Sequence, residues 1–281
     1  MNGVYFGSGI PVSPNLISWL LSGCDPQDSS AVLLFGETRV IANGISVQVP
    51  DGSKRLLAFV ALSSGRVDRR YAAGSLWPMA SDKHADGNLR SALWRLKSAG
   101  IDVLESGKGT LALRRATVVD VRVACEWAGR LVRGSPARDD LRTVSWRGGF
   151  LDLLPGWSED WVIVEREHVR QRLLHALEAL SRHLVKEGRY AEAVEAAVWA
   201  VSAGPLRESA IRVLIEAHLA EGNLIEARRV YQDYGSAVRR ELGIDPGKQL
   251  AGLVQVKVPR QNRPCEDISA DCAEPMIIGH S

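Results

Sequence analysis

The stretch GNLRSALWRLK, residues 87–97, has the spacing of a helix with one face toward the protein and the other toward a partner. Its leucines recur at i, i+4 and i+7 and therefore share one helical face: Leu89, Leu93 and Leu96. A rotation of about 100° per residue turns Ser91 and Trp94 away from that face. The flanks carry polar and basic side chains: Asn88, Arg90, Arg95 and Lys97. A solvated face rarely needs a tryptophan, so the pattern predicts a helix that binds a partner.

The segments around this stretch predict a winged helix-turn-helix. Strand-like runs at residues 39–42 and 45–49 flank Asn43-Gly44, a favoured hairpin turn. Three amphipathic helices follow at short intervals: residues 54–63, 68–77 and 83–99. Residues 101–121 then have the pattern of a strand, a glycine-rich turn, a second strand and a third short strand. In this arrangement the third helix is the reader and the terminal hairpin is the wing.

A helical repeat dominates the second half of the chain. Matching residues recur 34 positions apart, namely Leu180 with Leu214, Glu187-Gly188 with Glu221-Gly222, and Glu192-Ala193 with Glu226-Ala227. This period, with glycine in the turn and a small alanine after it, is typical of tetratricopeptide units. Such units need neighbours to bury their faces, and we expect helices near residues 121–133 and 158–186 to supply them.

The predicted fold class is therefore α+β, with an N-terminal winged helix-turn-helix followed by an all-α tetratricopeptide-like helical domain. We expect four regions: a mostly disordered extension at 1–30, the winged helix at 31–119, the helical domain at 120–255 and a disordered tail at 256–281.

The charge is distributed unevenly along the 281 residues, although the net charge is only +2. Residues 51–115 hold twelve basic and six acidic side chains, a net charge of +6, and the remainder of the chain carries −4. A basic segment joined to an acidic remainder favours a nucleic-acid-binding module with a partner module.

Other sequence features point away from secretion, a membrane, a metal and an enzyme. The four cysteines lie far apart without a C-x-x-C pair, and the longest apolar run spans only residues 31–35. No secretory leader opens the chain, so we expect a cytoplasmic protein. The string SGKGT at 106–110 lacks the spacing of a phosphate-binding loop, and His168, His175 and His183 are too far apart along one helix to share a metal. Without a catalytic grouping or dinucleotide fingerprint, we expect neither an enzyme nor a cofactor.

Several strings, in order, resemble the Streptomyces antibiotic regulatory proteins. Besides residues 87–97 they include AAGSLWP, WRGGFLDL, EDWVIVEREHVRQRLLHALEAL, PLRESAIRVLIEAHLAEGN and RELGIDPGKQL, and the resemblance runs from about residue 32 to 253. It implies an OmpR-type winged helix joined to a bacterial transcriptional activator domain. It also implies an activator that binds promoter direct repeats, often as a head-to-tail pair, and recruits RNA polymerase holoenzyme through its sigma factor and other subunits. Members commonly control secondary-metabolite (antibiotic) gene clusters.

The same resemblance assigns a polymerase-contact loop between the second and third helices: Met79, Ala80, Ser81, Asp82 and Lys83. In the wing, this chain has Gly109-Thr110 where the family often has Gly-Tyr, which makes Thr110 the candidate wing contact.

Major-groove recognition requires planar side chains with several donors, and arginine matches guanine as asparagine matches adenine. The base-contact candidates are accordingly Arg95, Asn88, Ser91 and Trp94. Phosphate contacts are predicted from basic residues of the same region: Lys54, Arg69, Arg70, Arg90, Lys97 and Lys108. The simpler alternatives are a solvated charge for Arg95, a hydrogen bond to the preceding loop for Asn88 and packing on the wing for Trp94.

Two other functions stay open at this point. The first is a tetratricopeptide-type protein-protein adapter without autonomous DNA reading. The second is a ligand-gated regulator with a small molecule among Trp146, Trp157, Trp161 and Trp199, because a sequence does not distinguish a pocket from a core.

Overall fold

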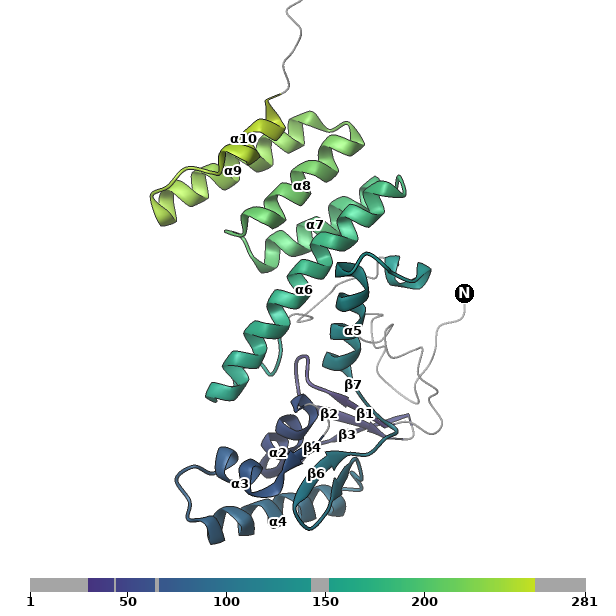
Figure 1. Ribbon diagram of the computed structural model, residues 1–281, viewed down its shortest axis with the longest axis vertical. Coiled ribbons are helices and arrows are strands. Elements are labelled where there is room, and N and C mark those ends of the chain that lie inside the picture. Colours follow the sequence, from purple (N-terminus) through teal and green to yellow (C-terminus); the bar gives the residue numbers. More distant parts are fainter. Residues whose placement is uncertain (1–29, 43, 64–65, 143–151, 256–281) are drawn as a thin grey trace, which may run out of the picture.

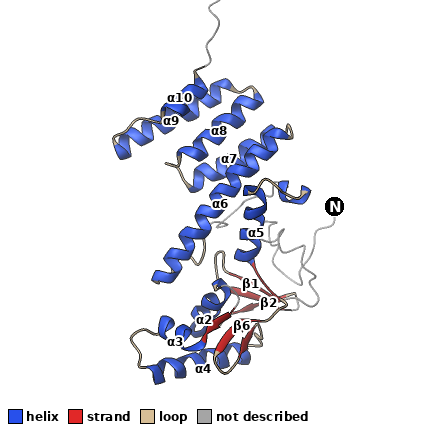
Figure 2. Cartoon of the chain, viewed as in Figure 1, coloured by secondary structure: helices blue, strands red, loops and turns tan. Residues whose placement is uncertain are grey.

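The computed structural model describes residues 30–42, 44–63, 66–142 and 152–255, with a strand-containing region at one end and a stack of helices at the other (Figure 1). Except for Ser30, the predicted N-terminal extension lies outside the described residues, as does the predicted tail at 256–281. The α+β class is confirmed, and the labelled strands all lie in the lower half of the view (Figure 2).

A four-stranded sheet opens the fold, in the order β3-β2-β1-β7. Its strands are β1 (Ser30–Leu33), β2 (Arg39–Ala42), β3 (Ile45–Gln48) and β7 (Thr117–Val119). The predicted hairpin pairs Val40 with Val47, and Gly44 adopts a φ of +74° that a residue with a side chain rarely adopts. β7 runs parallel to β1, so the strand after the wing returns to the first sheet.

Three helices and a second sheet complete the winged helix. The helices are α2 (Asp51–Leu62), α3 (Arg69–Leu76) and α4 (Asp82–Ser98). The second sheet has the order β4-β6-β5, with β4 (Arg66–Asp68), β5 (Leu104–Ser106) and β6 (Thr110–Leu113). The core between these helices and the second sheet includes Leu56, Val67, Leu89 and Leu111.

Most helix boundaries lie within one or two residues of the prediction, but the start of α2 and the strand β4 differ from it. α2 begins at Asp51, three residues before the predicted start at 54, because Pro50 occupies the N-cap and an acidic first residue suits a helix N-terminus. The short strand β4 was not predicted; it pairs with β6 of the wing, and Asp68 at its end caps α3 by accepting from the Tyr71 amide at 2.9 Å.

The helical region stacks consecutive helices against one another. It contains α5 (Asp120–Val132), a short 3-10 turn η1 (Arg138–Leu141), α6 (Asp160–Lys186), α7 (Tyr190–Ala203), α8 (Glu208–Glu221), α9 (Leu224–Leu242) and α10 (Lys248–Val254). The repeated glycines, Gly188 and Gly222, have φ values of +74° and +89° in the turns, and the repeated alanines, Ala193 and Ala227, are fully buried. The helical hairpins α6-α7 and α8-α9 are therefore the two predicted repeats.

A buried ion pair joins the two repeats. The Glu178 carboxylate on α6 accepts from Arg207 Nε at 2.6 Å and from Ser209 Oγ at 2.7 Å. Because Glu178 is buried, these bonds satisfy a charge that water does not reach.

The sheet and the helical region share one continuous core. Asp120, the first residue of α5, is buried and accepts from the Leu34 and Phe35 amides at 2.8 and 3.0 Å. Its pKa is raised from 3.8 to about 6 by burial, against the lowering effect of the backbone donors. On the same side of the sheet, Phe35 forms a bridge with Leu153, and the Leu154 amide donates to the Leu34 carbonyl at 3.0 Å.

None of the described helices is long and apolar enough to cross a membrane.

Candidate nucleic-acid interface

Helix α4 packs one face on the winged helix and leaves the other exposed. The buried face is formed by Ala85, Leu89, Ala92 and Leu96, while Leu93 is half-buried beside them. Ser53 on α2 fixes the backbone of α4, because its buried hydroxyl donates to the Ala92 carbonyl at 2.8 Å.

The predicted base-contact residues lie on the outward face and one flank of α4. Trp94 is 69% exposed, an exposure that leaves little of its ring to pack on the wing. Asn88, Ser91 and Arg95 are also exposed. Ser91 Oγ donates to the Gly87 carbonyl at 3.0 Å, a bond within the same helix.

Arg95 lies on the flank of α4 that faces α2. Its guanidinium lies over Gly52, so that a Cβ added to that glycine would come within 2.9 Å of Arg95 Nη1. No carboxylate in the described part of the chain forms an ion pair with Arg95. Its donors are thus available to a ligand.

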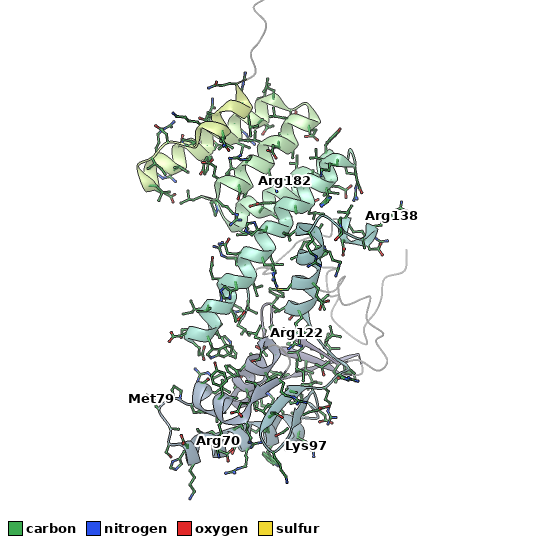
Figure 3. The ribbon with its side chains drawn as sticks, viewed as in Figure 1. Arg70, Met79, Lys97, Arg122, Arg138 and Arg182 are labelled. Carbon is green, nitrogen blue, oxygen red and sulfur yellow. The ribbon has the colours of Figure 1, made fainter. Side chains whose placement is uncertain are left out.

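Four of the six basic phosphate-contact candidates are exposed. Arg70 and Lys97 lie at the end of the molecule farthest from α9 and α10 (Figure 3). Lys108 is exposed in the turn between β5 and β6. Arg90 is exposed as well, but it forms an ion pair with Asp86 one helical turn away at 2.7 Å.

The other two basic candidates already have protein partners. The Arg69 side chain is 19% exposed; Nε donates to Asp86 at 3.2 Å and Nη1 to Ser106 Oγ at 2.8 Å, which ties α3 to α4 and the wing. The Lys54 side chain is 20% exposed and its Nζ lies 2.7 Å from Asp51. Arg69 therefore links three elements of the domain, whereas the Lys54 ion pair lies within the first turn of α2.

Thr110 is half-buried at the start of β6. Its carbonyl accepts from the Gly107 amide at 2.8 Å and closes the turn of the wing, while the Gly109 carbonyl accepts from the Arg69 amide at 3.0 Å. These bonds fix the position of the wing against α3.

The loop predicted at residues 79–83 to contact polymerase is shorter in the structure. α4 begins at Asp82, so Asp82 and Lys83 lie in its first turn, and Ser81 is the N-cap. Met79 is 98% exposed at the edge of the molecule, beside Ala80 (Figure 3). A methionine so exposed is unusual for a soluble surface and available to a partner.

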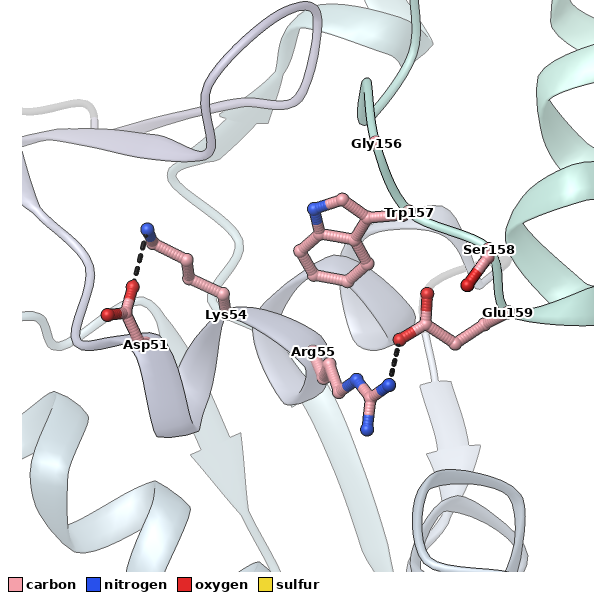
Figure 4. A pocket seen from close by; sticks show the side chains of 7 residues that line it. All are labelled: Asp51, Lys54, Arg55, Gly156, Trp157, Ser158 and Glu159. Carbon is pink, nitrogen blue, oxygen red and sulfur yellow. Dashed lines mark ion pairs between the residues drawn. The ribbon is translucent and has the colours of Figure 1, made fainter.

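A recess of about 280 Å³ lies where α2 meets the segment before α6 (Figure 4). Lys54 and Arg55 line it from α2, opposite Trp157 and Glu159, and Arg55 forms an ion pair with Glu159. Of the tryptophans considered as a ligand site, Trp157 lines this recess, while Trp161 packs edge-on against Phe59 with ring centroids 5.2 Å apart. Trp199 packs against the core, and Trp146 lies outside the described residues.

Sequence reasoning missed two contributions to this surface. Gly52 has no chemistry of its own, and its importance depends on a side chain 43 residues away. Arg55 belongs to the same basic segment as the other candidates, but nothing in the sequence indicates that it pairs with Glu159. Among the described residues, no group of three or more His, Cys, Asp or Glu side chains could hold a metal ion.

Comparison with known proteins finds similarity to bacterial transcription regulators. Residues 127–256 match the model of the bacterial transcriptional activator domain. The chain is 29% identical over 238 residues to Regulatory protein AfsR of Streptomyces griseus, covering 80% of this chain and 24% of that protein. It is also 29% identical over 269 residues to Regulatory protein AfsR of Streptomyces coelicolor, and this match covers 88% of this chain and 26% of that protein. The chain thus spans about a quarter of the length of these relatives.

The fold is similar to that of a solved structure, Mycobacterium tuberculosis EmbR in complex with a low affinity phosphopeptide. The TM-score is 0.59 at 17% identity, over 80% of this chain and 64% of the other. The family model and the two relatives thus support a regulator of the type that the sequence resembles, and the solved structure supports the fold.

Proposed function

We propose that this chain is a sequence-specific DNA-binding activator of transcription in which α4 enters the major groove. The observation that carries the proposal is the exposed side of α4, where a tryptophan that is 69% exposed lies among exposed polar and basic side chains. A major groove accepts one α-helix, and its base edges offer acceptors that a guanidinium and an amide can match.

In this proposal the side chains divide into two functions. Arg95 and Asn88 contact base edges, with Ser91 and Trp94 touching a base or the sugar-phosphate backbone beside them. Exposed cations contact phosphates and position the protein without reading sequence: Arg70, Arg90, Lys97 and Lys108, with the wing at Thr110. Arg69 contributes mainly by tying α3 to α4 and the wing, and Lys54 is held by Asp51 within α2.

Activation is assigned to the loop at 79–83 and to the helical region. The exposed Met79 and its neighbours would contact RNA polymerase holoenzyme, including its sigma factor, from a protein bound upstream of the promoter. The names of the relatives support regulation, and the resemblance to their family extends the proposal to direct-repeat operators, a head-to-tail pair on DNA, a cytoplasmic location and control of a secondary-metabolite gene cluster.

Footprinting of the full chain on the DNA flanking its own gene tests the proposal. Affinity for the protected site is then measured at several salt concentrations, and log K should fall with log salt by about 0.9 for each phosphate neutralised. Arg95→Ala is expected to cost about 1–3 kcal/mol at one base position, whereas Lys108→Ala weakens all sequences alike and lowers the salt slope by about one.

Arg229→Ala on α9 is the matched control, because it removes an exposed arginine far along the chain from α4. Equal losses on specific and random DNA for Arg95→Ala would refute its assignment as a base reader. Absence of any salt-dependent footprint would refute DNA reading altogether and favour the adapter function.

A further inference from the structure

Gly52 lies in the first turn of α2, directly beneath the Arg95 guanidinium. A Cβ at this position would lie 2.9 Å from Nη1, 3.0 Å from Cζ and 3.4 Å from Nε of Arg95. Separations below 3.0 Å are shorter than real carbon contacts, so any side chain at Gly52 would displace the guanidinium.

The two residues at this turn of α2 fix different parts of α4. Ser53 holds the backbone through its hydrogen bond to the Ala92 carbonyl, one turn before Arg95. Gly52 leaves space for the Arg95 side chain and so determines the direction in which its planar fork points. No ion pair among the described residues holds the guanidinium there, and the partial positive charge at the N-terminus of a helix does not attract a cation.

We propose that Gly52 is a specificity-determining positioning residue, which directs Arg95 toward the base edge because its missing side chain lets the guanidinium lie against the first turn of α2. The inference rests on the proposed function, since it concerns how Arg95 reads DNA. A bidentate contact to guanine O6 and N7 requires the guanidinium plane to be aligned with the base, and a displaced fork loses one of the two bonds.

Gly52→Ala tests the proposal, with Gly252→Ala in α10 as the matched control. Both glycines are helical, and a Cβ at Gly252 meets nothing within 4 Å. Both changes raise helix propensity, and the atoms displaced at Gly52 are the far end of a flexible side chain, so neither variant should lose its fold. Circular dichroism and melting temperature check this.

Affinity is measured for the operator selected by the wild-type chain and for every single-base change in it. In Gly52→Ala, discrimination at the position read by Arg95 should fall about tenfold while affinity for random DNA is retained. Gly252→Ala should match the wild type, and the double variant Gly52→Ala/Arg95→Ala should be no worse than Arg95→Ala. An unchanged base preference in Gly52→Ala, or additive losses in the double variant, would overturn the role of Gly52.

A second measurement needs no DNA. The Nε–Hε resonance of Arg95, assigned by its loss in Arg95→Lys, should shift in free Gly52→Ala and stay in place in Gly252→Ala. An unmoved resonance would overturn the inference. If the wild type selects no operator, the proposed function fails together with this one, whereas a wild type that reads an operator which Gly52→Ala reads equally well overturns the inference alone.

Discussion

The buried carboxylate of Asp120 should make the stability of this protein fall as pH rises through mildly acidic values. Its Oδ2 accepts from the backbone amides of Leu34 and Phe35, directly after β1, and its Oδ1 accepts from the Val121 amide at 2.7 Å. Burial nevertheless raises its pKa from 3.8 to about 6. Because the folded pKa lies above the unfolded one, the folded chain binds more protons between these values, and the free energy of unfolding falls as pH rises.

Over the whole titration, the pKa shift lowers the free energy of unfolding by about 3 kcal/mol, and about 2 kcal/mol of this loss occurs between roughly pH 4.5 and pH 7. Asp120→Asn isolates it, because the amide is neutral throughout this range. Asn keeps one oxygen for the paired sheet amides, but its NH2 group faces the Val121 amide and leaves that donor unpaired, at a pH-independent cost of about 1–3 kcal/mol.

Urea denaturation followed by tryptophan fluorescence gives the free energy of unfolding of both proteins across this pH range. The advantage of wild type over Asp120→Asn should shrink by about 2 kcal/mol on going from roughly pH 4.5 to pH 7. Asp102→Asn, which removes an exposed carboxylate paired with Arg114, is the control and should show no such trend. Parallel curves for wild type and Asp120→Asn would refute the reasoning.

Three further substitutions test other parts of the fold. Glu178→Ala leaves Arg207 without its carboxylate partner between the two repeats and should lower the free energy of unfolding by about 3 kcal/mol in urea; a loss below about 1 kcal/mol would contradict a buried pair. Asp68→Ala removes the cap of α3 and should cost about 1 kcal/mol by the same assay, whereas Asp68→Asn should recover most of it. Gly222→Ala places a side chain at a φ of +89° and should lower the free energy of unfolding by about 1 kcal/mol, which is measured as a lower melting temperature. An unchanged melting temperature would exclude strain there.

Local patterns predicted the elements of this fold because their causes are local. The first hairpin needs positive φ at Gly44, and the cap of α3 needs an oxygen three residues before Tyr71. The repeat needs a glycine and an alanine that each recur after 34 residues. The leucine spacing of residues 87–97 likewise sets which side of α4 is buried. Each of these conditions can be met within a few turns of chain, so the sequence displays it directly.

The partners of charged residues could not be predicted in the same way. Arg69 and Lys54 belong to the same basic segment as Lys97 and Lys108, and their sequence neighbourhoods do not separate them. Arg69 differs from the exposed cations because it donates a hydrogen bond to Ser106, 37 residues away. Lys54 differs because it lines a recess whose opposite wall comes from the segment before α6. Such contacts depend on tertiary packing, which a pattern of residue types along the chain does not contain.

Helix α2 connects the proposed DNA-reading helix to the activator domain. In its first turn, Ser53 donates a hydrogen bond to the backbone of α4. Two residues later, Arg55 forms an ion pair with Glu159, the N-cap of α6. Farther along, Phe59 packs on Trp161 of α6, and the Ser63 carbonyl after its end accepts from Arg122 of α5 at 2.6 Å. A helix is stiff along its axis because every turn is hydrogen-bonded to the next. These contacts therefore fix the orientation of α4 relative to the helical stack. If α4 reads DNA as proposed, the way it enters the groove sets the direction in which the helical stack points.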